Sequence, residues 1–136
     1  MEDVSKKIVF IVDDDEFLLD MYVLKFQESG FAIEVAKGGE EALEKLRAGL
    51  KPDVMLLDIV MPHLDGFELL RIVKKEQLSP RAKIIMLTNL GQKEDVDRGL
   101  RLGADDYIVK AQFTPTEIVQ RVQAILGNTK NDASAS

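Results

Sequence analysis

The stretch VMLLDIVMPHLDG, Val54–Gly66, joins an apolar run to two acids, and the rest of the chain can be organised around it. Its first four residues, Val54–Leu57, form a short unbroken apolar run, which is typical of a strand covered on both faces. The run leads directly into Asp58, a residue that a buried strand has little structural reason to carry. The sequence must therefore supply something that offsets the cost of a carboxylate at the edge of a core.

Four further segments have the character of this run, and helical patterns lie between them. The predicted strands are short and rich in Val and Ile, and they cover Lys7–Val12, Phe31–Ala36, Asp53–Asp58, Ala82–Leu87 and Asp106–Lys110. Apolar residues recur every three or four positions in the intervening segments. Because strands that alternate with helices form parallel sheets, we expect an α/β fold. It would be a doubly wound five-stranded parallel sheet, (βα)5 and flavodoxin-like, with strand order 2-1-3-4-5.

The helix signals and the tail define one domain over residues 6–127. Glycines close three of the predicted helices, at Gly30, Gly49 and Gly103. The motif TPTE, residues 114–117, predicts a capping box at the start of the last helix. Residues 92–102 predict a weaker helix carried by Val96 and Leu100. Residues 1–5 remain as an N-terminal extension, and the polar residues 128–136 as a tail that we expect to be disordered.

The composition is that of a globular protein without thiol chemistry. Of the 136 residues, 46% are hydrophobic and 31% are charged, so a packed core is expected. The absence of Cys excludes disulfides and thiolate metal sites. No apolar run approaches the ~20 residues of a membrane span, and the net charge of −6 argues weakly against direct binding to nucleic acid or to an anionic membrane. We expect a cytoplasmic protein.

Chemically distinctive residues follow the predicted strands at their carboxyl ends. These ends lie at one edge of the sheet, where ligands bind in such folds, and they carry Asp13, Asp14, Asp15, Asp58, Thr88 and Lys110. Crowded carboxylates need a cation to neutralise them, and oxygen ligands without His or Cys nearby favour a hard ion such as Mg²⁺. A metal, an ammonium and a hydroxyl around one carboxylate indicate a site for a phosphoryl group on Asp58.

Each of these residues also has a purely structural interpretation. Asp15 is equally well placed to cap the helix that follows it. Thr88 alone could end a strand, and Lys110 alone could be a solvated charge; their gathering at one edge favours a functional site. Asp65-Gly66 predicts a turn and cap for the next helix, and His63, the only His, is expected on the surface.

Four motifs carry a resemblance to a known family: VDDD at 12–15, LLDIVMPHLDG at 56–66, LT at 87–88 and GADDYIVK at 103–110. Together they resemble the receiver domain of bacterial two-component response regulators, from about Lys6 to Gly127, and the length is similar to that of stand-alone, chemotaxis-type regulators. The resemblance implies a signalling protein, not a turnover enzyme. It would receive a phosphoryl group from a sensor histidine kinase or a histidine phosphotransfer protein and control an unknown downstream protein.

The resemblance also implies a specific role for each acidic residue. Asp58 would accept the phosphoryl group. Asp14 and Asp58 would bind Mg²⁺, or Mn²⁺ in its place, together with the backbone carbonyl of Val60. Asp13 would act through a metal-bound water.

A conformational switch is implied by the same resemblance. Lys110 would pair with the phosphoryl oxygens, Thr88 would move inward to bind them, and Tyr107 would change rotamer with it. Residues 92–113 would carry the output face. The protein would be a monomer, or a weak dimer formed through this face and the last helix. The segment 92–102, with Gly99 inside it, would be the part that moves.

Several positions near the site depart from the family pattern or tune it. Ala111 follows Lys110 where the family usually has a proline after a cis bond; a non-proline cis peptide costs about 2.5–4 kcal/mol, so we predict a trans bond and a rearranged loop. Asn89 stands where a smaller residue is usual, and would narrow the access to the phosphate or offer an amide to it. The apolar Val60 and Leu90 predict a long-lived phosphoryl state.

Other interpretations stay open. The D-x-D of Asp13 and Asp15 is reminiscent of haloacid-dehalogenase phosphatases, although Glu16-Phe17 follow it instead of Gly-Thr. A flavodoxin-type flavin carrier would need a hydroxyl- and glycine-rich phosphate loop where DDDEF stands. The chain could also be the receiver of a larger regulator whose output domain is absent, and any DNA contact would then belong to that domain.

Overall fold

One parallel sheet of five strands forms the centre of the protein. The computed structural model describes the backbone of residues 6–135 and the side chains of residues 6–127. The strands are β1 (Ile8–Val12), β2 (Ala32–Ala36), β3 (Val54–Leu57), β4 (Lys83–Thr88) and β5 (Asp106–Val109). All neighbouring pairs are parallel and the order is β2-β1-β3-β4-β5, which confirms the predicted fold class and topology. The predicted N-terminal extension, residues 1–5, lies outside the described residues.

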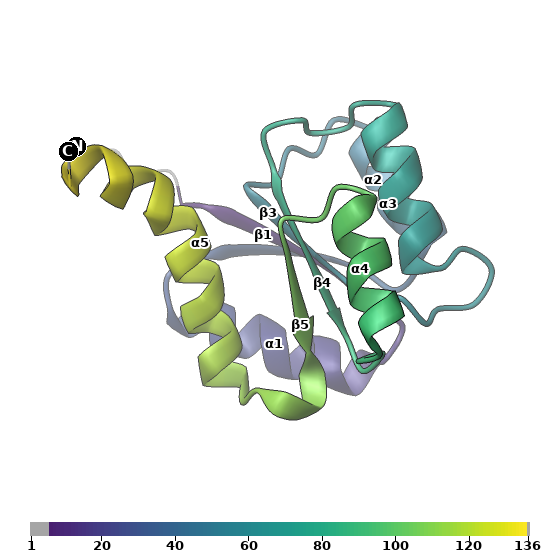
Figure 1. Cartoon of the computed structure of the whole chain (residues 1–136), viewed down its shortest axis with the longest axis horizontal. Coiled ribbons are helices and arrows are strands. Elements are labelled where there is room, and N and C mark those ends of the chain that lie inside the picture. Colours follow the sequence, from purple (N-terminus) through teal and green to yellow (C-terminus); the bar gives the residue numbers. More distant parts are fainter. Residues whose placement is uncertain (1–5, 136) are drawn as a thin grey trace.

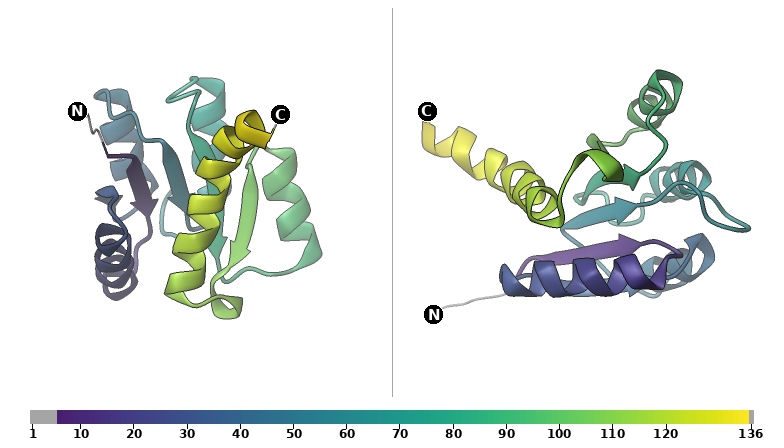
Figure 2. Two further views of the ribbon diagram at one scale, coloured as in Figure 1. Left: turned by 90° about the vertical axis from the view of Figure 1, so that its left-hand side faces the viewer. Right: turned by 90° about the horizontal axis from the view of Figure 1, so that it is seen from below.

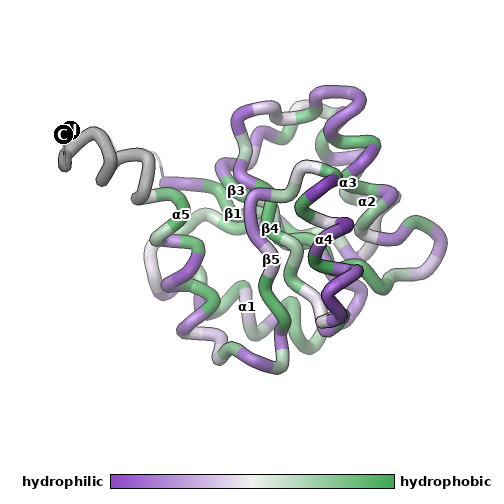
Figure 3. Tube along the Cα trace, in the orientation of Figure 1, coloured by the Kyte–Doolittle hydropathy of each residue, from purple (hydrophilic) through white to green (hydrophobic). Residues whose placement is uncertain are grey.

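Helices cover both faces of this sheet. Figure 1 shows α1 (Glu16–Glu28) and α5 (Pro115–Ala135) on one side of the strands, and α2 (Gly39–Arg47), α3 (Gly66–Lys75) and α4 (Lys93–Arg101) on the other. The rotated views of Figure 2 show the same layered arrangement. Because successive side chains of a strand point to opposite faces, Phe10 packs under α2 and α3 while Val9 and Ile11 pack under α1 and α5. Figure 3 shows apolar strands enclosed by helices with polar outer faces.

The predicted helix ends are largely confirmed. The Thr114 hydroxyl accepts from Glu117 N at 3.1 Å and the Glu117 carboxylate accepts from Thr114 N at 2.8 Å, a complete capping box. Gly30, Gly49 and Gly103 have the positive φ of helix C-termini, 90°, 111° and 111°. The helix α5 extends to Ala135, through most of the segment predicted as a disordered tail, and no break separates residue 127 from residue 128 in the backbone.

The buried face of α4 differs from the prediction. Leu100 is 46% exposed, and the buried residue of this helix is Gly99. The ring of Tyr107 explains the difference, because a Cβ on Gly99 would lie 3.1 Å from Tyr107 Cδ2 and 3.3 Å from Met86 Cγ. The glycine therefore allows α4 to approach β4 and β5 closely, in addition to any local weakening of the helix.

Candidate functional site

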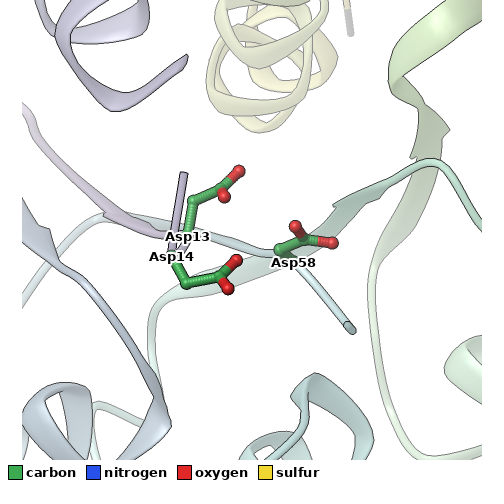
Figure 4. Close-up of side chains that lie close together, drawn as sticks. All are labelled: Asp13, Asp14 and Asp58. Carbon is green, nitrogen blue, oxygen red and sulfur yellow. The ribbon is translucent and has the colours of Figure 1, made fainter. Parts of the chain in front are cut away.

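The strand register brings the distinctive residues to one edge of the sheet. Val12 of β1 pairs with Leu57 of β3, so the residues that follow them, Asp13 and Asp58, leave the sheet side by side. Thr88, the last residue of β4, lies opposite Val109 of β5, and Lys110 comes next along the chain. The convergence predicted from the sequence is therefore observed, and Figure 4 shows Asp13, Asp14 and Asp58 as its acidic part.

Lys110 is the centre of an ion-pair network that joins the ends of three strands, β1, β3 and β5. Its Nζ donates to Asp13 Oδ2 at 2.6 Å and to Asp58 Oδ2 at 3.0 Å. The exposed fractions of the side chains are only 8% for Lys110, 2% for Asp13 and 10% for Asp58, so these charges interact with little screening by water. The network links residues 97 and 52 positions apart in the sequence. The alternative that Lys110 is a charge exposed to solvent is therefore wrong.

Backbone N–H groups hold the other oxygen of each acid. Asp13 Oδ1 accepts from Asp15 N at 2.9 Å, and Asp58 Oδ1 accepts from Ile59 N at 2.7 Å. Each carboxylate is thus fixed at both oxygens, and neither is free to rotate away from Lys110. The backbone at Asp58 is fixed as well, since Gly66 N donates to Ile59 O at 2.9 Å and a Cβ on Gly66 would lie 2.7 Å from Ile59 Cα.

The electrostatics of the site follow from three acids and one ammonium. Burial raises the pKa of the Asp13 carboxyl, and the hydrogen bonds from Lys110 and Asp15 only partly oppose this effect. Burial by itself would lower the pKa of the Lys110 ammonium, but the attraction of Asp13 and Asp58 outweighs it and the pKa is raised. Lys110 is thus held in its charged form, and this one ammonium faces the three carboxyl groups of Asp13, Asp14 and Asp58.

These acids fit a divalent cation. One carboxylate oxygen from each of Asp13, Asp14 and Asp58 lies within 4.8 Å of the other two. Asp14 is exposed while the other two are buried, so the group is open on one side. An all-oxygen donor set with excess negative charge is what Mg²⁺ prefers, and an open side leaves room for waters and a phosphate oxygen. The site therefore contains the residues that the predicted metal would need.

Of the predicted switch residues, Thr88 and Lys110 line the same cleft, and Tyr107 contacts the lining residue Leu90. The lining of the cleft includes Val60, Thr88, Asn89 and Leu90 together with the acids and Lys110. Thr88 is fully buried, and its Oγ1 accepts from Leu90 N at 3.3 Å. The Tyr107 hydroxyl donates to Leu90 O at 2.5 Å, and burial raises the pKa of Tyr107 to about 12, which keeps this donor protonated.

Four predictions near the site have structural outcomes. Asp15 does not join the acidic group. Its side chain accepts from Leu18 N at 3.2 Å as the N-cap of α1, which confirms the structural alternative for this residue. The described residues contain no cis peptide bond, so the bond between Lys110 and Ala111 is trans, as predicted. His63 is exposed, and Asp65 caps α3 by accepting from Glu68 N at 2.8 Å.

Sequence reasoning missed how the loop after Lys110 is built. Residues Lys110–Gln112 form a short 3₁₀ helix, η1. Ala111 N donates to Asn89 Oδ1 at 3.0 Å, so two departures from the family pattern are in contact with each other. The polar Asn89 beside Thr88 was the only sign in the sequence of this hydrogen bond. Its partner is the backbone N–H of Ala111, and a backbone group cannot be recognised from the residue type.

Comparison with known proteins decides the family. A family model, the response regulator receiver domain, matches residues 9–123. The chain belongs to the response regulator receiver family. It is 38% identical over 134 residues to the transcriptional regulatory protein CreB of Escherichia coli, covering 97% of this chain and 56% of CreB. It is 39% identical over 132 residues to the alkaline phosphatase synthesis transcriptional regulatory protein PhoP of Bacillus subtilis, covering 97% of this chain and 53% of PhoP.

A solved receiver domain has the same fold over almost its whole length. The CheY-like response regulator receiver domain protein from Methanospirillum hungatei superposes with a TM-score of 0.84 at 31% identity, covering 94% of this chain and 99% of that one. The chain spans about half the length of the two curated regulators above. Receiver domains are signalling domains of two-component systems that interact with histidine kinases, and not turnover enzymes, which removes the phosphatase and flavin-carrier interpretations. No helix in the described part of the chain is long and apolar enough to cross a membrane.

Proposed function

We propose that this receiver is switched by phosphorylation of Asp58. The observation that carries the proposal is the position of Asp58 at the end of β3, between the acids after β1 and Thr88 at the end of β4. Asp13 shares the contact with Lys110 and lines the same cleft, but its side chain is 2% exposed against 10% for Asp58. We assign the acceptor role to Asp58 because it also holds the acceptor position in the LLDIVMPHLDG motif of the receiver family.

The chemistry is the transfer of a phosphoryl group from a phosphohistidine to a carboxylate. An oxygen of Asp58 forms the new P–O bond as the P–N bond of the donor breaks, and the imidazole leaves with the electron pair of that bond. Mg²⁺ held by Asp13, Asp14 and Asp58, with the carbonyl of Val60, would neutralise charge on the carboxylate and the phosphoryl oxygens. Lys110 already lies 3.0 Å from Asp58 Oδ2, and its ammonium would bind a phosphoryl oxygen.

Phosphorylation would act on the loop between β4 and α4. In the structure the Thr88 hydroxyl accepts from Leu90 N; in the phosphorylated state it would donate to the phosphate. Leu90 O is in turn bound by the Tyr107 hydroxyl, whose ring packs against Gly99 of α4. Movement of the loop would thus reach α4 and β5 through direct contacts, and residues 92–113 would change their outer face.

The partners follow from this assignment. A sensor histidine kinase or a histidine phosphotransfer protein would supply the phosphoryl group in the cytoplasm, and a protein would receive the output through α4, β5 and α5. The chain would be a monomer or a weak dimer. It would act either alone or as the receiver of a longer regulator. The second arrangement is supported by the relatives, which are transcriptional regulators about twice as long. Contact with DNA would then be made by the output domain.

Acetyl phosphate tests the acceptor without a cognate kinase. The protein is incubated with acetyl phosphate and Mg²⁺, and its intact mass is measured with Asp58→Asn and Asp14→Asn variants in parallel. We expect one phosphoryl group on the wild type, none on Asp58→Asn, and strongly reduced labelling of Asp14→Asn. Labelling of Asp58→Asn to the wild-type level would overturn the assignment of Asp58.

A further inference from the structure

The Asn89 carboxamide joins the two loops that carry the proposed phosphate ligands. Its Oδ1 accepts from Ala111 N at 3.0 Å, across 22 residues of sequence. Asn89 directly follows Thr88, and Ala111 directly follows Lys110. The hydrogen bond therefore links the main chain next to Lys110 to the main chain next to Thr88.

The local structure makes this bond specific. A backbone N–H only donates, so the oxygen of the carboxamide must be the atom that faces Ala111. Ala111 lies in the short helix η1, and the first N–H groups of a helix have no acceptor within it. Asn89 supplies that acceptor from another strand end. The bond thus also needs a residue with a backbone N–H at position 111, which Ala provides and proline would not.

Lys110 needs such a constraint. Its ammonium must contact both Asp13 and Asp58, at 2.6 and 3.0 Å, from the end of a flexible four-carbon side chain. The main chain at Lys110 belongs to the 3₁₀ helix η1, which has only three residues. A helix of this length does little by itself to fix the position of the main chain. A shift of that main chain would move the ammonium away from the carboxylates.

We propose that Asn89 is a positioning residue for Lys110. Through the Ala111 N–H, it holds the main chain of Lys110 against the end of β4, so that the ammonium stays at Asp58 and at a fixed separation from the Thr88 hydroxyl. This inference rests on the proposed function of Asp58 as acceptor. It gives the departure at position 89 a structural role that is different from contact with the phosphate itself.

The test uses variants that differ in the acceptor oxygen. Asn89→Ala removes the acceptor, Asn89→Asp keeps an oxygen within reach of the Ala111 N–H, and Gln112→Ala is the control in the same exposed turn. Three quantities are measured: the initial rate of phosphorylation by acetyl phosphate, the hydrogen-exchange rate of the Ala111 amide, and the NMR signal of the Lys110 ammonium. Urea unfolding of each variant shows whether the fold is intact.

We expect Asn89→Ala to slow phosphorylation by about three- to tenfold, the effect of one hydrogen bond, and to speed exchange of the Ala111 amide and of the Lys110 ammonium protons. Asn89→Asp retains the slow exchange of the amide, and Gln112→Ala resembles the wild type. The proposal is wrong if Asn89→Ala leaves the phosphorylation rate and the Lys110 signal unchanged. If the wild type is not phosphorylated at all, the proposed function fails, while the exchange measurements still decide whether Asn89 holds Lys110.

Discussion

Replacement of Lys110 by Ala tests the electrostatic structure of the site. The change removes the partner of two carboxylates whose side chains are 2% and 10% exposed. Removal of one partner of a buried ion pair typically costs 3–5 kcal/mol, but this group is open to solvent at Asp14. We therefore expect the free energy of unfolding to fall by about 3 kcal/mol in EDTA, at the lower end of that range.

Magnesium should recover part of this loss. Without the ammonium, the three carboxylates carry one more unit of negative charge and bind a divalent cation more tightly. A tenfold gain in affinity would stabilise the variant by a further ~1.4 kcal/mol at saturating Mg²⁺. The difference in stability between wild type and Lys110→Ala should accordingly narrow to roughly half when Mg²⁺ replaces EDTA.

Urea unfolding followed by circular dichroism measures both effects. The control is Lys93→Ala, which breaks a 2.7 Å pair with Asp97 on the surface of α4, where the lysine side chain is 86% exposed. Such a pair contributes less than about 0.5 kcal/mol. A loss below about 1 kcal/mol for Lys110→Ala in EDTA, or equal stabilisation of both proteins by Mg²⁺, would refute the reasoning.

Three further predictions concern single side chains. Gly66→Ala should lower the free energy of unfolding by about 1–3 kcal/mol in urea, because its Cβ would lie 2.7 Å from Ile59 Cα, next to the acceptor. The control Gly38→Ala has open space around its Cβ and should cost less than about 1 kcal/mol, the effect of a less favourable N-cap residue of α2. The pKa of Tyr107 is raised from 10.0 to about 12, so the folded state keeps this proton after the unfolded state has lost it, and stability should fall between pH 10 and 12. Tyr107→Phe should flatten that fall when urea unfolding is measured at alkaline pH, and an unchanged fall would contradict the assignment to Tyr107. Val60→Gln should shorten the lifetime of the phosphoryl group on Asp58 in Mg²⁺ buffer. Val60 is 62% exposed and borders the cleft, so a polar side chain there can orient the attacking water. The lifetime is measured by intact mass, and an unchanged value would contradict this prediction.

Much of the fold could be predicted because its signals are local and repeated. The five apolar runs differ from the observed strands by no more than a residue at either end. The alternation of strands and helices predicted a parallel sheet, and the flavodoxin-like topology then supplied the strand order. The position of Asp58, Thr88 and Lys110 at strand ends placed them at one edge of that sheet. The capping box of Thr114 and Glu117 is also local, since both partners lie within one turn of helix.

The parts that could not be predicted depend on contacts between distant segments. Whether Asp15 joins the acids or caps α1 depends on where its oxygen points, which its neighbours in the sequence leave open. The burial of Gly99 instead of Leu100 follows from the ring of Tyr107 on the adjacent strand. The bond between Asn89 and Ala111 has a backbone group as one partner, so the residue types alone do not indicate it.

The phosphorylated residue can be identified chemically, which tests the role of Asp58 most directly. An acyl phosphate on an aspartate is reduced by borohydride to homoserine, so the protein is treated with acetyl phosphate and Mg²⁺, reduced and digested, and its peptides are sequenced by mass spectrometry. We expect homoserine at position 58 alone, and no homoserine when Mg²⁺ is replaced by EDTA. Homoserine at position 13 or 14 in place of 58, or unmodified peptides throughout, would contradict the central claim.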